Sequence, residues 1–112
     1  MKFEFSPFVA IQVKDHEKAI YFYKNVLGME FNYVKDNDTY LKSGPMNFVF
    51  EKAAEGKCLF FELKVDNMQE AKKILTDAGC KVTREYSDKN MMFSDPYGMN
   101  FHVFEKGLFN NA

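Results

Sequence analysis

The clearest chemical signal in this sequence is a glutamate placed among apolar residues. Glu62 lies within the apolar run from Leu59 to Leu63, where its carboxylate would be desolvated and would need a partner. His102, in the same half of the chain, is the natural partner, with Lys64 as a second candidate. Glu62 and His102 could form a structural hydrogen bond, act as a general acid and base, or bind a ligand. The residues alone leave these three roles open.

Few other side chains offer reactive chemistry. Cys58 and Cys80 have apolar neighbours and form no C-x-x-C pair, so we expect two reduced thiols rather than a zinc ribbon or a redox motif. Arg84 is the single arginine, and it could form a surface ion pair or contact an anionic group of a ligand. His16 follows Asp15 at the expected start of a helix, and we predict that it lies on the surface.

The composition excludes several classes of partner. The 112 residues are 46% hydrophobic and 28% charged with a formal net charge of −1, whereas nucleic-acid readers carry a clustered basic excess. No apolar run reaches the roughly 20 residues that span a bilayer. We therefore expect a cytoplasmic protein that binds neither nucleic acid nor membrane. The thirteen Phe and six Tyr exceed what a small core needs, which favours an aromatic-lined cavity.

An internal repeat organises these residues. The segment Met46–Lys52 resembles Met99–Lys106, 53 positions later, and Glu17-Lys18-Ala19 resembles Gln69-Glu70-Ala71 at a spacing of 52. Repeats at a fixed spacing indicate duplicated structural units. The sequence predicts a single domain over 1–112 made of two modules, about 5–55 and 57–106, with a boundary near Gly56.

Both halves have the same order of expected elements. Apolar runs over 8–13 and 59–65 predict an opening strand in each half. Asp15 and Asp66 are placed as helix N-caps, and Gly28 and Gly79 as left-handed residues that end the helices. Further strands are expected over 29–34, 39–41 and 47–51, and again over 81–86, 91–94 and 100–105. The predicted fold class is α+β, with the order βαβββ occurring twice.

The two expected helices differ in the strength of their pattern. The first has the clearer helical spacing of apolar residues, and the second is weaker. The expected apolar positions are Ala19, Ile20, Phe22, Tyr23, Val26 and Leu27 in the first helix and Met68, Ala71, Ile74, Leu75 and Ala78 in the second.

These features resemble a known superfamily. The Phe22-Tyr23 and Leu27-Gly28 pairs in the first half, together with the turn Asp95-Pro96-Tyr97-Gly98 before the last strand, are similar to the vicinal oxygen chelate superfamily of glyoxalases, bleomycin-resistance proteins and extradiol dioxygenases. The resemblance extends from about Phe8 to Lys106. It implies that the two modules form a curved, half-barrel mixed sheet around a cavity.

The resemblance also implies where a metal would lie. Enzymes of this superfamily hold a divalent metal with four residues, two in the first strands and two in the last strands of the modules. The matching positions here are Phe8, Phe60, Val49 and His102. Phe and Val have no donor atom, and one imidazole does not hold a divalent ion alone. We therefore expect no metal at the superfamily's position.

A displaced metal site is the alternative. Side chains alternate between the faces of a strand, so Gln12 shares a face with Phe8, Glu51 with Val49, and Glu62 with Phe60. A Zn, Ni, Mn or Fe ion could then be held by Gln12, Glu51, Glu62 and His102. A polar rim that faces water is the simpler interpretation of Gln12 and Glu51.

Two functions from different classes follow. The first is a metal-free protein of the bleomycin-resistance type that binds a partly apolar or aromatic small molecule in a Phe-lined cavity. The second is a metal-dependent lyase, such as a lactoylglutathione lyase, an isomerase or a dioxygenase with the shifted ligands. Enzymatic activity is left open, with Glu62 and His102 as the candidate catalytic residues. The predicted ligand pocket comprises Phe8, Gln12, Val49, Phe60, Glu62, Met92, His102 and Phe104.

The resemblance also implies a homodimer, because small two-module members are typically two-fold dimers. Exposed sheet edges invite pairing, and Phe3, Phe5 and Phe109 add apolar surface near the two ends of the chain. Phe3 and Phe5 alternate as in a strand, which could pack on the partner or exchange with it.

Overall fold

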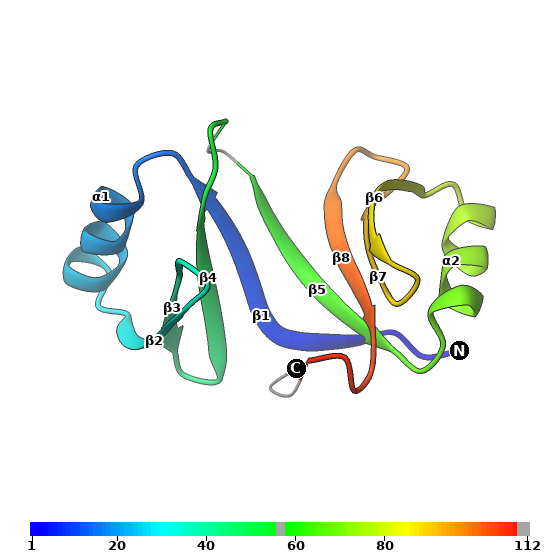
Figure 1. Ribbon diagram of the computed structural model, residues 1–112, viewed down its shortest axis with the longest axis horizontal. Helices are drawn as coiled ribbons and strands as arrows, with labels where there is room; N and C mark the ends of the chain where they lie inside the picture. The colour runs from blue at the N-terminus through cyan, green and yellow to red at the C-terminus, as the bar shows by residue number, and fades with distance from the viewer. Residues whose placement is uncertain (56–57, 110–112) are drawn as a thin grey trace. The chain divides into compact units, whose positions relative to one another are not determined.

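The computed structural model describes residues 1–55 and 58–109. Its first half contains the predicted βαβββ order, with a short π-helical segment after the first helix (Figure 1). The elements are β1 (Glu4–Val13), α1 (His16–Tyr21), η1 (Phe22–Val26), β2 (Glu30–Lys35), β3 (Asp38–Ser43) and β4 (Met46–Lys52). Every strand expected in this half is confirmed, and β1 begins four residues earlier than the apolar run predicts.

The second half repeats the order. Its elements are β5 (Leu59–Val65), α2 (Met68–Asp77), β6 (Lys81–Ser87), β7 (Asn90–Ser94) and β8 (Asn100–Glu105). The bounds of β5 and β8 are those expected from the sequence. The α+β class with two βαβββ modules is therefore confirmed.

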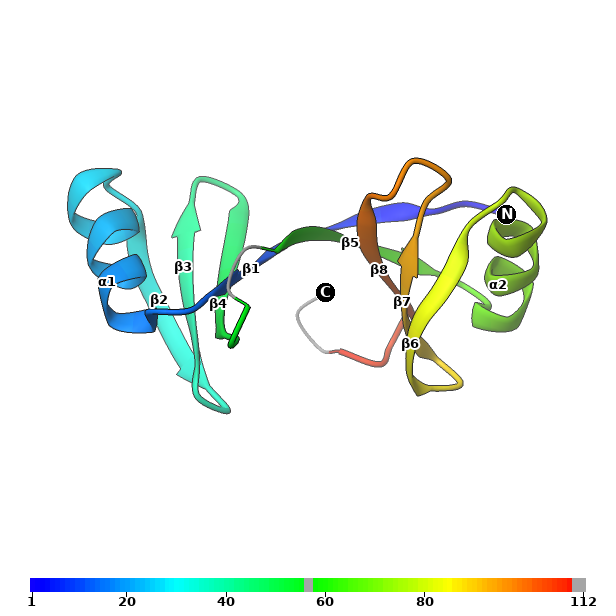
Figure 2. The ribbon, with the colours of Figure 1, turned by 90° about the horizontal axis from the view of Figure 1, so that it is seen from above.

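Each module builds four mixed strands with the same topology. The strand order is β2-β3-β4-β1 in the first module and β5-β8-β7-β6 in the second. The opening strand pairs in parallel with the last one, β1 with β4 and β5 with β8, and the other pairs within each module are antiparallel. In both modules the helix lies on one face of its own strands (Figures 1 and 2), so the opposite face has no helix over it.

The core of the second module lies between α2 and its strands. Its buried members come from alternate strand positions and from the helix: Val65, Met68, Ala71, Met91, Phe93, Phe101 and Val103. The first module has a smaller buried cluster of Ile11, Leu41 and Phe50, against which Ala19, Ile20 and Tyr23 pack.

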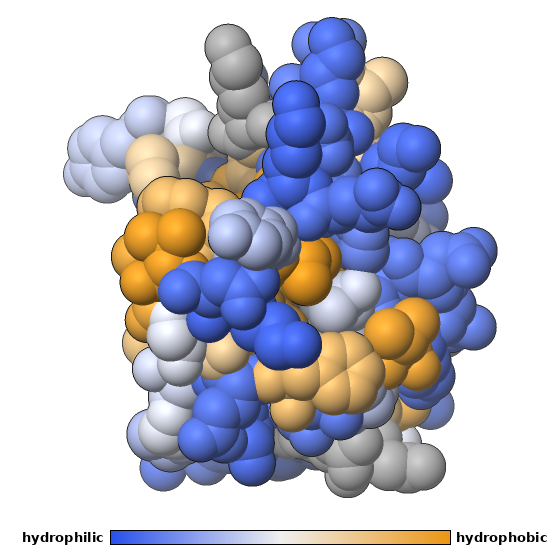
Figure 3. Space-filling view, turned by 90° about the vertical axis from the view of Figure 1, so that its left-hand side faces the viewer, coloured by the Kyte–Doolittle hydropathy of each residue, from blue (hydrophilic) through white to orange (hydrophobic). Residues whose placement is uncertain are grey.

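The first helix is irregular, which corrects part of its predicted apolar face. The Leu27 amide donates to the Phe22 carbonyl, the five-residue step of a π-helix, and this wider turn carries Val26 and Leu27 away from the strands. Phe22, Val26 and Leu27 are exposed, although their helical spacing groups them with the other expected apolar positions. Figure 3 shows apolar side chains lying among polar ones on this side of the molecule.

One of the two predicted helix caps is wrong. Asp15 caps α1 as expected, accepting a hydrogen bond from the Lys18 amide at 3.1 Å. In α2 the cap is Asn67, whose side chain accepts from the Glu70 amide at 2.9 Å. Asp66 instead pairs with the Lys106 ammonium at 3.1 Å.

The glycines and the turn predicted from the sequence are confirmed. Gly28 and Gly79 follow the two helical segments with φ of 78° and 101°. The carboxylate of Asp95 accepts hydrogen bonds from the Tyr97 and Met99 amides at 2.8 and 2.9 Å, which fixes the turn before β8.

The chain divides into two compact units. One comprises Pro7–Leu59, and the other comprises Phe60 onward together with Met1–Ser6. The first residues of β1 thus belong with the second module. The boundary predicted near Gly56 lies outside the described residues, and the half-barrel curvature stays a prediction. Within residues 1–55 and 58–109, no helix is long and apolar enough to cross a membrane.

Candidate functional site

The helix-free face of the second module carries the predicted polar residues. Glu62 on β5 lies opposite His102 on β8, and His102 lies opposite Met92 on β7. Their neighbours Phe101 and Met91 point the other way, into the core against α2. Alternation along the strands therefore places Glu62, His102 and Met92 in one row across three strands.

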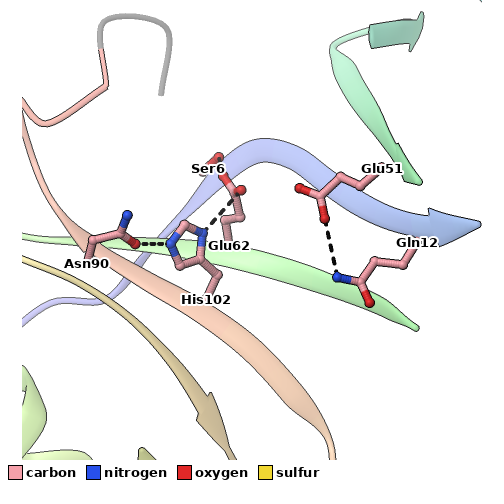
Figure 4. A network of polar contacts seen from close by, with 6 residues as sticks. All are labelled: Ser6, Gln12, Glu51, Glu62, Asn90 and His102. Atoms are coloured by element: carbon pink, nitrogen blue, oxygen red, sulfur yellow. Dashed lines mark hydrogen bonds and ion pairs between the residues drawn. The ribbon is translucent and has the colours of Figure 1, made fainter. Parts of the chain in front are cut away.

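Glu62 and His102 belong to a chain of polar contacts with Ser6 and Asn90, whose side chains are drawn in Figure 4. The His102 Nδ1 atom lies 3.3 Å from the Glu62 Oε1 atom, which is the contact expected from the sequence. The Ser6 hydroxyl donates to the Glu62 Oε2 atom at 3.2 Å. On the other side of the imidazole, His102 Nε2 contacts the Asn90 side-chain oxygen. The order of the contacts is therefore Ser6, Glu62, His102, Asn90.

Both ring nitrogens of His102 are thus engaged by the protein itself. An imidazole offers two nitrogens, and an imidazolium donates from both of them. Here each nitrogen faces an oxygen of the protein, and the side chain of His102 is only 10% exposed. Neither nitrogen is left open for a metal ion or for the proton of a substrate in this arrangement.

Aromatic rings surround the same imidazole. The ring centroids of Phe104, Tyr86 and Phe109 lie 5.6, 6.0 and 6.3 Å from that of His102. Phe104 is fully buried and meets Phe109 edge to face at 4.9 Å, whereas Phe109 and Tyr86 are exposed. The site therefore has a buried polar chain with partly exposed aromatic side chains beside it.

The first module carries the other predicted residues on its own helix-free face. The Gln12 amide donates to the Glu51 carboxylate at 3.4 Å. Phe8 and Val49 are buried, and Phe8 meets Tyr40 edge to face at 6.1 Å. By the repeat, Val49 stands where the second module has His102, so this face lacks an imidazole. That these residues and Phe60 line the same pocket as His102 stays a prediction.

The residues present do not fit a metal centre. At the superfamily's four positions, Phe8, Val49 and Phe60 have no donor atom, and both nitrogens of His102 are already occupied. In the described parts of the chain, no three His, Cys, Asp or Glu side chains gather into a possible metal-binding group.

Several site residues were not identified from the sequence. Asn90 lies two residues before Met92 and shares its face by strand alternation, so the sequence could have identified it. Ser6 precedes the predicted strand, and Phe109 follows the last strand, so no periodic pattern marks either residue.

Two further predictions meet different outcomes. His16 lies at the surface only in part: it is half-buried, and its Nε2 contacts the Phe50 carbonyl at 3.2 Å. Burial raises the pKa of the nearby Asp38 carboxyl, and the charge of His16 partly offsets that rise. Among the described residues, neither Cys58 nor Cys80 forms a disulfide, as expected. Burial also raises the pKa of Cys80.

Comparison with known proteins identifies the family. A model of the glyoxalase-like domain matches residues 8–104. The chain therefore belongs to the glyoxalase-like family, as the sequence motifs indicated. No protein with curated annotation has a matching sequence.

Solved structures share the fold at low sequence identity. A superfamily member from Vibrio splendidus 12B01 is 15% identical with a TM-score of 0.66, over 94% of this chain and 100% of that one. A hypothetical protein from Bacillus halodurans C-125 is 11% identical with a TM-score of 0.72 over the full length of both chains.

A larger enzyme has the same fold in part of its chain. Homoprotocatechuate 2,3-dioxygenase from Brevibacterium fuscum, in complex with 3,4-dihydroxyphenylacetate, is 23% identical with a TM-score of 0.68. The match covers 93% of this chain and 37% of the dioxygenase. This chain therefore spans little more than a third of that enzyme.

Proposed function

We propose that this protein binds a partly apolar or aromatic small molecule on the helix-free face of its second module, without a metal ion. The observation that carries the proposal is the surroundings of His102: both ring nitrogens are occupied by the protein, and three aromatic rings lie around the imidazole. The contacts from Ser6 to Asn90 hold these side chains in place, so they can form one fixed side of a binding site. Aromatic side chains beside it supply stacking and apolar burial.

The proposed pocket includes Met92 besides the residues that form the polar contacts of the second module. Met92 lies in the row of Glu62 and His102, and a flexible thioether adapts to flat ligands. Curvature of the strands, as the family resemblance implies, would turn this face into a cavity. The dioxygenase bound to 3,4-dihydroxyphenylacetate supports an aromatic ligand by analogy of fold alone.

Binding is favoured over catalysis by the same contacts. A general base must reach a proton of the substrate, whereas the His102 nitrogens are turned toward Glu62 and Asn90. The metal-dependent alternative would need Gln12, Glu51, Glu62 and His102 to act together. His102 would have to leave its present partners to do so.

Two measurements on dialysed protein test the proposal. Metal analysis by mass spectrometry should find no stoichiometric Zn, Ni, Mn or Fe. The neutral aromatic probe 2-naphthamide should raise the melting temperature of the wild type equally with and without EDTA. A near-stoichiometric metal that survives dialysis would contradict the proposal.

A pair of variants on β8 locates the probe. Phe104→Leu should weaken the thermal shift caused by 2-naphthamide, because the fully buried Phe104 packs against His102 and Phe109 and supports the aromatic side chains of the helix-free face. Phe101→Leu is the matched control, since Phe101 packs in the core on the other face. It should lower the melting temperature but keep the shift caused by the probe. Equal shifts in both variants would place the binding elsewhere.

The homodimer predicted from the sequence is a separate proposal. Phe5 is exposed at the start of β1, and Phe22 and Phe31 are exposed in the first module, which supports an apolar contact. Light scattering after size exclusion should give about twice the mass of 13.1 kDa. A single monomeric mass at micromolar concentration would refute the dimer.

A further inference from the structure

Among the residues that the structure describes, the single arginine has no polar partner. Arg84 lies on β6 and is exposed. Its guanidinium stands 5.0 Å from the centre of the Tyr86 ring, and within residues 1–55 and 58–109 no hydrogen bond or ion pair to it is present. The neighbouring carboxylate of Glu85 pairs with Lys72 at 3.9 Å instead. The five N–H donors of Arg84 are therefore open to solvent or to a ligand.

A β-bulge aims Arg84 at the candidate site. Residues two apart on a regular strand share a face, and Val82 packs against the core. The register between β6 and β7 shifts between Val82 and Arg84, however, so that Arg84 lies opposite Met92. Bulges re-aim side chains in this way, and they occur often beside functional sites.

Arg84 thereby completes a row across all four strands of the second module. Arg84 lies opposite Met92, Met92 opposite His102, and His102 opposite Glu62. Tyr86 connects the ends of the arginine and histidine side chains, because its ring meets the guanidinium at 5.0 Å and the imidazole edge to face at 6.0 Å.

The two charged ends of this row differ in what they can still bind. Glu62 already accepts from Ser6 and contacts His102, so a cationic ligand would compete with partners that are in place. Among the described residues, Arg84 contacts only the face of Tyr86, which holds the guanidinium in position and leaves its edges free. A guanidinium edge matches a carboxylate through two parallel hydrogen bonds.

We propose that Arg84, held on Tyr86, is the anion subsite of this pocket and that the ligand is a flat aromatic or partly apolar carboxylate. This inference rests on the proposed function, since the apolar part of the ligand would lie toward Met92 and the exposed Phe109 ring beside His102. The carboxylate would reach the exposed end of the row, where its charge is partly solvated.

A matched pair of probes tests the subsite. 2-Naphthoate and 2-naphthamide share one shape, and only the first is charged at neutral pH. Calorimetric titration of the wild type should give about tenfold tighter binding of the naphthoate, the gain typical of a charge-assisted hydrogen-bonded pair. In Arg84→Gln the naphthoate should lose about tenfold in affinity, and the naphthamide should bind as before.

The control for net charge is Lys81→Gln. Lys81 is an exposed cation on the same strand, opposite Ser94 rather than Met92, so its loss should leave both affinities unchanged at physiological salt. An equal drop in Arg84→Gln and Lys81→Gln would show that only the general field of the protein attracts the anion, which would overturn the subsite.

The remaining outcomes separate the subsite from the proposed function. Equal affinities of the two probes for the wild type, or naphthoate binding that is unaltered in Arg84→Gln, would overturn the anion subsite and leave the aromatic pocket standing. Failure of both probes to bind the wild type at millimolar concentration would overturn the subsite and the proposed function together.

Discussion

The two modules have the same order of strands and helix, but they differ in their cores and in the polar side chains on their helix-free faces. The second has a regular ten-residue helix over a core of seven buried residues. The first has a six-residue helix that widens into a π-helical segment, and its buried cluster has three members. On the helix-free faces, the second module has the chain from Ser6 to Asn90, whereas the first has a Gln12–Glu51 contact at 3.4 Å.

This difference shows what a duplicated fold preserves. Strand pairing depends on the backbone and on alternating apolar residues, so both copies keep it. A site depends on a few outward side chains, and these can change without loss of the strands. Val49 and His102 are equivalent positions, and only one of them can take part in a polar network.

Core truncation at equivalent positions gives the largest expected effect. Phe93 and Leu41 are 52 residues apart and both are fully buried. Phe93→Ala should cost about 4 kcal/mol and Leu41→Ala about 3 kcal/mol of unfolding free energy, from lost burial and the remaining cavity. Urea unfolding measures both. A cost below about 1 kcal/mol for Leu41→Ala would mean that the first core adds little to stability.

The next largest effect is a difference in stability between alanine substitutions at the two glycines that end the helices. Both have positive φ, which strains any residue with a Cβ. A Cβ at Gly79 would also lie 3.2 Å from the ring of Pro96, whereas nothing lies within 4 Å of one at Gly28. Gly79→Ala should therefore cost about 2 kcal/mol and Gly28→Ala about 1 kcal/mol. Thermal melts of the two variants decide the order, and equal costs would argue against the Pro96 contact.

The corrected helix cap supplies a smaller effect. Asn67→Ala should cost about 1 kcal/mol, because the Glu70 amide at the start of α2 loses its acceptor. Asp66→Ala should cost less, since its carboxylate forms only an exposed ion pair. Chemical denaturation of both variants tests the assignment. A larger loss for Asp66→Ala would restore the cap predicted from the sequence.

The smallest effect concerns the N-terminal segment that joins the second module. Hydrogen bonds from the Lys106 and Lys2 ammonium groups hold the pKa of the Glu4 carboxyl below its usual value. Because the folded pKa is the lower one, this contact stabilises the segment above the usual pKa of 4.5 and is lost as the pH falls through the folded pKa. Amide exchange at Phe5 and Ser6, corrected for intrinsic rates, should quicken below about pH 4.5. Glu4→Gln should remove that pH dependence, and its persistence would assign the effect to another group.

Much of this architecture could be predicted from the sequence, because strand patterning and turn residues act locally. The need of a desolvated Glu62 carboxylate for a partner in its own half of the chain also predicted its contact with His102. It could not predict Ser6, which reaches the site from outside the apolar run. The stronger helical pattern belonged to the first helix, yet the π-helical step exposed Phe22 and Val26. Such a step depends on local packing and hydrogen bonding, which the spacing of apolar residues in the sequence does not predict.

NMR spectra of the methionine methyl groups test most directly whether the ligand binds on the helix-free face of the second module. Met92 lies on that face, Met91 is buried on the opposite one, and Met29 packs in the first module's core. With methyl-labelled methionine and 2-naphthamide, we expect a saturable shift of the Met92 methyl signal while those of Met91 and Met29 stay in place. A shift confined to Met29, or none at Met92 under saturating probe, would contradict it.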